Sequence, residues 1–75
     1  TIRYELPEDG LVNITIYDIT GRHISTLVSS HQNAGYKSVI WDATNDYGDP
    51  VSAGVYLYKI QACEFIQTKQ MVLLK

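Results

Sequence analysis

The side chains best able to do chemistry gather in one acidic loop of the sequence. The hard oxygen ligands that Ca²⁺ prefers are present on Asp42, Asn45, Asp46 and Asp49. Their spacing is not that of an EF-hand, and no glutamate closes the loop. Aspartate and asparagine are also common in turns, because their side chains hydrogen-bond to the nearby backbone. We therefore interpret this segment as a structural turn and keep it as a weaker candidate for a calcium site.

The other reactive side chains form no catalytic or metal-binding pattern. The two histidines, His23 and His31, do not have a zinc-ligand spacing, and a single cysteine cannot complete such a site. Ser29 and Ser30 precede His31, but no G-x-S-x-G context surrounds them. We expect a protein that is not an enzyme, that uses no cofactor, and in which Cys63 is a small buried residue.

Length and charge restrict the function further. The chain has 75 residues, enough for one domain with a thin core. Its formal net charge is −2 and its basic residues are scattered, which argues against nucleic acid or an anionic membrane as a partner. No apolar run approaches the ~20 residues of a membrane-spanning helix. The alternating pattern already begins at Thr1, so we interpret residues 1–75 as one domain taken from a larger protein.

Alternation of apolar and polar residues dominates the chain and predicts half-buried strands. It is clearest at Val12, Ile14 and Ile16, with Asn13 and Thr15 between them. The pattern predicts strands over residues 1–6, 11–17, 23–28, 36–42, 55–62 and 67–74. Turns are expected at 7–10 and 18–21, and polar loops at 29–35 and 45–50. Six to seven short strands without a helical period predict an all-β antiparallel sandwich, with a barrel as the alternative.

Several residues of this pattern have a structural interpretation. Trp41 is expected to bury its ring between the sheets, and Asp42 to cap the following turn. Gly54 precedes a strand, where glycine permits an unusual φ or a close approach of another group. Tyr56 and Tyr58 stand two apart and so share one face of that strand. We interpret both tyrosines as packing residues and not as a carbohydrate platform.

Three segments of the chain resemble a known family. The first is residues 14–22, which contain Tyr17 and Gly21. The second begins at Trp41 and Asp42 and continues through Gly48, Gly54, Tyr56 and Tyr58, and the third is residues 68–75. In this order and at these spacings they resemble type A C-terminal sorting domains of the type IX (Por) secretion system. The second segment, with its long 45–50 loop, also resembles the immunoglobulin-like domain of flagellar hook-capping proteins.

The resemblance implies an immunoglobulin-like sandwich at the C-terminus of a larger bacterial protein, after a catalytic or adhesive domain. It implies that the outer-membrane secretion machinery is the partner, and that the protein passes through the periplasm to the medium or the cell surface. By the same resemblance, the residues that the machinery recognises lie in the last strand: Lys69, Met71, Val72, Leu73, Leu74 and Lys75.

Other functions remain open at the level of sequence. The domain is alternatively a passive immunoglobulin-like spacer or an assembly module of a surface or hook-capping-type protein. It is also compatible with an accessory domain of a secreted hydrolase. A calcium- or sugar-binding module is a weaker hypothesis, because the acidic loop and the dispersed tyrosines have structural explanations.

Overall fold

Two antiparallel sheets make up the fold. The computed structural model of the chain describes residues 2–74. Its strands are β1 (Ile2–Leu6), β2 (Gly10–Asp18), β3 (His23–Gln32), β4 (Gly35–Val39), β5 (Gly54–Ala62) and β6 (Phe65–Leu73). One sheet has the order β3-β2-β5-β6, and the other pairs β1 with β4. The predicted all-β antiparallel sandwich is thus confirmed. Among residues 2–74, no helix is long and apolar enough to cross a membrane.

The core lies between the sheets and is built from alternate residues. On β2, the side chains of Val12, Ile14 and Ile16 are completely buried, as their spacing predicted. The other buried apolar side chains belong to β1 and β5, namely Ile2, Leu6, Tyr56, Ile60 and Ala62. Full burial of one such aliphatic or aromatic side chain contributes about 1.5–3 kcal/mol. The middle strands of the large sheet therefore carry most of the stabilising contact with β1.

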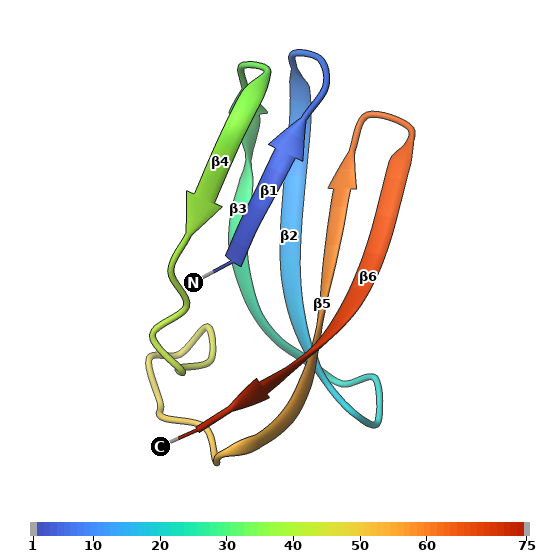
Figure 1. The fold of residues 1–75 in the computed structure, drawn as a ribbon. Coiled ribbons are helices and arrows are strands. Elements are labelled where there is room, and N and C mark those ends of the chain that lie inside the picture. The colour runs from blue at the N-terminus through green and yellow to red at the C-terminus, as the bar shows by residue number, and fades with distance from the viewer. Residues whose placement is uncertain (1, 75) are drawn as a thin grey trace.

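The two sheets differ in width, and this difference determines what is exposed. In Figure 1, β1 and β4 lie in front of β3 and β2, while β5 and β6 extend beyond them on the right. A link between the layers is the Tyr4 hydroxyl of β1, which donates a hydrogen bond to Gln32 Oε1 of β3 at 2.5 Å. The small sheet thus lies over the β3 side of the large one.

Residues 29–35 were predicted to form a loop, and this prediction is wrong. β3 continues to Gln32, and β4 already begins at Gly35. The polar residues 29–32 pair with residues 10–13 of β2, and Ser29, Ser30 and His31 are exposed. Backbone pairing with β2 therefore extends the strand although its side chains are hydrophilic.

The predicted strand 36–42 is too long at its C-terminal end. β4 ends at Val39, which pairs with Ile2 of β1. Ile40, Trp41 and Asp42 lie outside every strand, because within the described residues β1 offers them no further partner.

The predicted burial of Cys63 is also wrong. Cys63 and Glu64 form the two-residue turn between β5 and β6, and Cys63 is exposed. Its φ is 56°, in the left-handed region that such tight hairpin turns require. The turn geometry, and not the apolar character of the thiol, determines where this residue lies.

Asp18 organises the turn between β2 and β3. Its Oδ1 accepts hydrogen bonds from Thr20 N (2.9 Å), Thr20 Oγ1 (2.6 Å) and Arg22 N (2.9 Å). Gly21 has φ 90°, which glycine adopts without steric cost. The Thr20 hydroxyl, followed by the Arg22 backbone N–H, lowers the pKa of Asp18 below the ordinary aspartate value. The turn predicted at 18–21 is thus confirmed.

Truncation of a buried apolar side chain should lower the stability of the domain much more than truncation of an exposed one. We expect Ile14→Ala to lower the free energy of unfolding by about 2–5 kcal/mol, since it leaves a cavity in the core. Val72, with 62% of its surface exposed, serves as the control. Val72→Ala should change stability by no more than about 0.5 kcal/mol. Urea denaturation of both variants measures this, and equal losses would contradict the placement of the core.

The Asp18 turn should make stability depend on acid pH. Because folding lowers the Asp18 pKa, its contribution is complete above the unfolded-state pKa and is lost as pH falls through the folded-state value. We expect the urea midpoint of the wild type to fall as the pH drops below about 4, the ordinary aspartate pKa. The Asp18→Asn variant, which does not titrate there, should show a shallower fall. An identical pH profile for both proteins would refute this role.

Candidate recognition strand and the opposite sheet edge

The last strand, β6, forms one edge of the large sheet. Among residues 2–74 its one partner is β5, and its nine residues pair without a register shift from Ala62↔Phe65 to Gly54↔Leu73. It contains no proline, and Lys69 is its only charged residue. β6 is therefore a long and regular edge strand.

Exposure of β6 is high along most of its length. Residues 65–70 are all exposed, whichever face of the sheet they occupy. Phe65, Gln67 and Lys69 pair with Ala62, Ile60 and Tyr58 and so occupy the core-facing side. They remain exposed because the small sheet does not extend over β6 (Figure 1). Most of β6 is thus held by backbone pairing and not by burial.

The predicted recognition residues divide into two groups. Met71 and Leu73 are partly buried and pack against the core. Val72 and Leu74 are 62% and 84% exposed. Within residues 2–74, Lys69 makes no ion pair. Lys75, the remaining predicted residue, lies outside the described residues.

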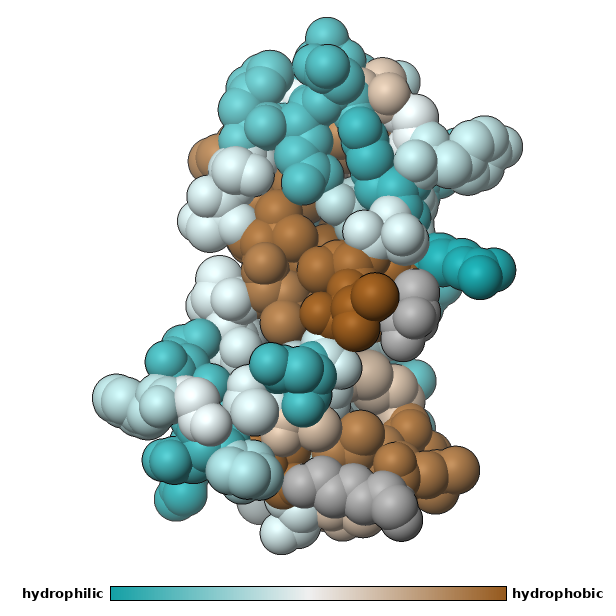
Figure 2. All heavy atoms as spheres, turned by 90° about the vertical axis from the view of Figure 1, so that its left-hand side faces the viewer, coloured by the Kyte–Doolittle hydropathy of each residue, from teal (hydrophilic) through white to brown (hydrophobic). Residues whose placement is uncertain are grey.

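Apolar surface is not confined to β6. Figure 2 shows the side of the molecule that is on the left in Figure 1, and brown surface appears there at mid-height and again at the lower end, with polar atoms between. Exposed apolar side chains outside β6 include Ile40 and Tyr47, which are 75% and 90% exposed. Hydrophobicity alone therefore does not identify a recognition site on this molecule.

The opposite edge of the large sheet, β3, is irregular. The register between β2 and β3 shifts twice, so that Leu27 and Ile24 of β3 have no partner on β2. These two β-bulges increase the local twist and interrupt the row of edge groups. The irregularity lies in the same half of β3 that contacts the acidic loop.

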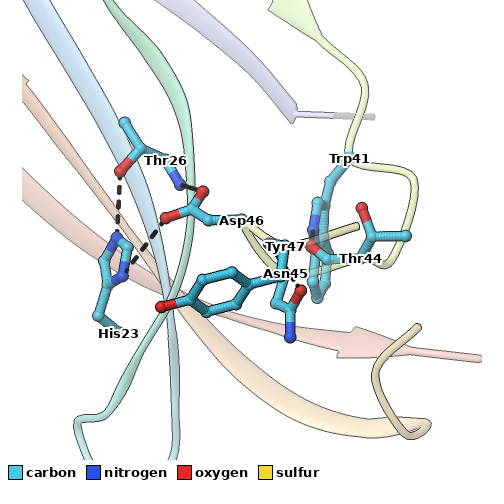
Figure 3. Close-up of polar contacts among 7 residues, drawn as sticks. All are labelled: His23, Thr26, Trp41, Thr44, Asn45, Asp46 and Tyr47. Atoms are coloured by element: carbon cyan, nitrogen blue, oxygen red, sulfur yellow. Dashed lines mark hydrogen bonds and ion pairs between the residues drawn. The ribbon is translucent and has the colours of Figure 1, made fainter. Parts of the chain in front are cut away.

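Asp46 of the acidic loop occupies this edge (Figure 3). Its backbone N–H donates to Ile24 O at 3.2 Å, and its Oδ1 accepts from Thr26 N at 3.0 Å. Its Oδ2 lies 3.7 Å from His23 Nδ1, and His23 Nε2 is 3.0 Å from Thr26 Oγ1. One aspartate therefore satisfies an acceptor and a donor of β3 that a neighbouring strand would otherwise use.

The calcium candidates have other partners in this structure. Asn45 Oδ1 accepts from the backbone N–H groups of Tyr47 and Asp49 at 2.9 and 3.0 Å. Asp42 Oδ1 accepts from Thr44 Oγ1 at 2.5 Å, and Asp46 faces β3. In the described part of the chain, no three acidic, histidine or cysteine side chains are grouped to hold a metal ion. The loop is built as a sequence of turns with Asp46 directed at the sheet.

Trp41 connects this loop to the core. Its ring meets Tyr56 edge to face, with 5.2 Å between ring centroids, and its Nε1–H donates to Thr44 O at 2.9 Å. The Tyr56 hydroxyl donates to Ser52 O at 2.6 Å. The expected packing of Trp41 and Tyr56 is thus present, although Trp41 is only partly buried and comes from the loop.

The remaining motif residues have local roles. Tyr58 is partly buried against the core, and Tyr17 contacts the His23 ring edge to face at 6.0 Å between centroids. Gly48 lies in the turn of the acidic loop, where its N–H donates to Asn45 O at 3.0 Å. Gly54 has φ 153°, and no atom lies within 4 Å of where a Cβ would stand. Of the two reasons for a glycine at this position, the unusual φ is therefore present, whereas a close approach of another group to Gly54 is not.

The contact of Asp46 with Thr26 and His23 was missed by sequence reasoning. The partners are twenty or more residues apart, since Thr26 and Asp46 differ by 20 positions. Asp46 has the local appearance of a turn former, and no pattern in the sequence indicates which strand the loop contacts. The chain topology is what brings them together.

A family comparison agrees with this architecture. The family model described as FlgD Ig-like domain matches residues 1–64 of the chain. The chain belongs to the FlgD Ig-like domain family. The predicted relation to the immunoglobulin-like domain of hook-capping proteins is thereby confirmed. In this FlgD Ig-like domain the match includes β1 to β5 and ends just before β6 begins at Phe65. Searches among curated proteins and among solved structures gave no match.

Removal of the Asp46 side chain should destabilise the FlgD Ig-like domain through the loss of the β3 contact. We expect Asp46→Ala to lower the free energy of unfolding by about 1 kcal/mol, a value reduced because the carboxylate is partly exposed. Asp49→Ala is the matched control, since Asp49 contributes only backbone bonds to the loop. It should change stability by less than about 0.5 kcal/mol. Equal urea midpoints for the two variants would mean that Asp46 does not secure the edge.

Proposed function

We propose that this domain is a non-catalytic C-terminal module that directs a larger protein across the outer membrane through the type IX secretion machinery. The observation that carries the proposal is β6, which is regularly paired along its length and yet has residues 65–70 exposed. The resemblance of residues 68–75 to the end of sorting domains supports it. In this proposal β6 is the strand that the machinery recognises.

Folding uses only a few side chains of β6. Met71 and Leu73 hold the strand against the core, because they are its partly buried residues. The side chains of Lys69, Val72 and Leu74 face solvent. A side chain without a packing role is available for recognition by a partner. We therefore assign recognition to Lys69, Val72 and Leu74, together with Lys75.

The proposal includes the setting of the domain. It follows a catalytic or adhesive domain in the same parent chain and accompanies it through the periplasm to the medium or the cell surface. Residues 2–74 form two antiparallel sheets with a buried cluster between them, which supports an appended unit with its own core.

A second candidate function is an immunoglobulin-like spacer or assembly module. The match to the FlgD Ig-like domain favours it, because that family is named after a hook-capping protein. The match does not extend to β6, so it bears on the shared architecture and not on the recognition strand. The two functions differ in one requirement. A sorting signal must cause the export of a protein to which it is fused, whereas a spacer or assembly module need not.

Export of a reporter tests the proposal. The chain is fused to the end of a periplasmic reporter in a host with the type IX machinery, and reporter in the medium is measured. We expect export with the wild-type domain and at least about fivefold less with Lys69→Ala combined with Val72→Ser. These exposed positions should alter stability by no more than about 0.5 kcal/mol each.

Thr68→Ser, also exposed on β6, is the control and should export normally. Retention of the wild-type fusion in the periplasm, in a host that exports its own cargo, would overturn the sorting function. Equal export of the double variant and the wild type would overturn the assignment of the recognised residues.

A further inference from the structure

The two edges of the large sheet differ in how they are protected. On β3, Asp46 engages Ile24 O and Thr26 N, and two bulges interrupt the strand. Proteins commonly protect sheet edges by bulges, covering loops, prolines or inward-pointing charges. β6 has nine regular pairs with β5, no proline and one charge, at Lys69. Of these protecting features β6 has only the charge of Lys69 on its core-facing side, so in the described residues it is the more regular of the two edges of the large sheet.

The hairpin geometry indicates which groups of β6 face this open edge. In a two-residue hairpin, the N–H of the residue after the turn faces the partner strand, and here that residue is Phe65. The direction alternates along an antiparallel pair. The N–H groups of Ile66, Thr68, Gln70 and Val72 are therefore directed away from β5. They form a row of backbone donors along the outer side of β6.

We propose that the free edge of β6 binds an extended segment of another protein as a further strand of this sheet. The inference deepens the proposed function, because it gives the mode by which the recognition strand is bound. Addition of a strand to an exposed edge obtains affinity from main-chain hydrogen bonds and specificity from alternate side chains. The length and regularity of β6 suit this mode of binding.

The charge on β6 selects the kind of partner. Lys69 is the middle residue of the nine in β6, so two copies paired symmetrically about it would place one Lys69 opposite the other. Like charges directly opposite each other destabilise a strand pair, and opposite charges stabilise it. A second copy of this chain is thus disfavoured, and a segment with an acidic residue opposite Lys69 is favoured.

The neighbours of Lys69 complete the description of the partner. Phe65 and Leu73 share its face of the sheet, because they lie four residues away on either side. Phe65 is 52% exposed, so an apolar side chain opposite it would be buried on binding. The expected partner is an extended segment with an acidic residue opposite Lys69 and apolar residues four positions away from it, opposite Phe65 and Leu73.

The test uses the 75-residue chain and two synthetic peptides. In both, valine and threonine alternate, and the central valine position holds glutamate in one peptide and lysine in the other. Binding is followed by NMR amide shifts. We expect shifts along β6 and not along β3, with about two- to tenfold weaker binding of the lysine peptide.

Substitutions then separate backbone recognition from side-chain recognition. Thr68→Pro removes one outward N–H and should weaken binding of the glutamate peptide at least about tenfold, since proline is tolerated on an edge but cannot donate. Thr68→Val keeps the N–H and should bind as the wild type does. Lys69→Glu should reverse the preference between the two peptides, and this variant decides the matter even where Thr68→Pro does not fold.

The inference is overturned by the absence of shifts on β6 with the glutamate peptide, by an unchanged peptide preference in Lys69→Glu, or by wild-type binding of a folded Thr68→Pro. A concentration-dependent dimer of the wild type through β6 would also overturn it, in favour of a second copy. Failure of reporter export leaves peptide binding unaffected, so the sorting function and this mode of binding are separately testable.

Discussion

A two-stranded sheet that must cover a four-stranded one determines most of this structure. β1 supplies Ile2 and Leu6 against the buried row of Val12, Ile14 and Ile16, and β4 extends this small sheet by pairing with β1. Burial is nearly complete there, and it decreases toward β6, where the core-facing side chains remain exposed. A further strand in the β1-β4 sheet would cover the core-facing side chains of β6. The exposure of β6 is therefore a consequence of strand number, and the sequence of β6 then decides what the exposed strand contacts.

The loop between β4 and β5 covers part of the large sheet at its β3 edge, which is the edge opposite β6. Trp41 packs on Tyr56 at the lower end of the core, and Asp46 bonds to the edge of β3. Asn45 holds the loop in shape by accepting two backbone N–H groups, so that Asp46 is presented in one position. Of the residues that suggested a cation site, Asp46 bonds to the edge of β3, whereas Asp42 and Asn45 form hydrogen bonds within the loop. The loop thus caps the β3 edge at Ile24 and Thr26, and β6 has no such contact in the described residues.

The sequence predicted those features that depend on neighbours along the chain. Alternation at Val12, Ile14 and Ile16 identified the core strand, and Asp18 with Gly21 identified the turn. The extension of β3 could not be predicted, because residues 29–32 are polar and form a strand only through pairing with β2. The contact of Asp46 with Thr26 was equally invisible, since it depends on where topology places the loop.

Native-state amide hydrogen exchange tests directly whether the two edges of the large sheet are unequally protected. The Thr26 N–H is bonded to Asp46 Oδ1, whereas the Thr68 N–H faces the open side of β6. Both residues lie in edge strands of the same sheet, so differences in global stability do not separate them. We expect the Thr26 N–H to exchange at least about tenfold more slowly than the Thr68 N–H, because exchange requires the protecting hydrogen bond to open. Equal exchange rates, or slower exchange at Thr68, would contradict it.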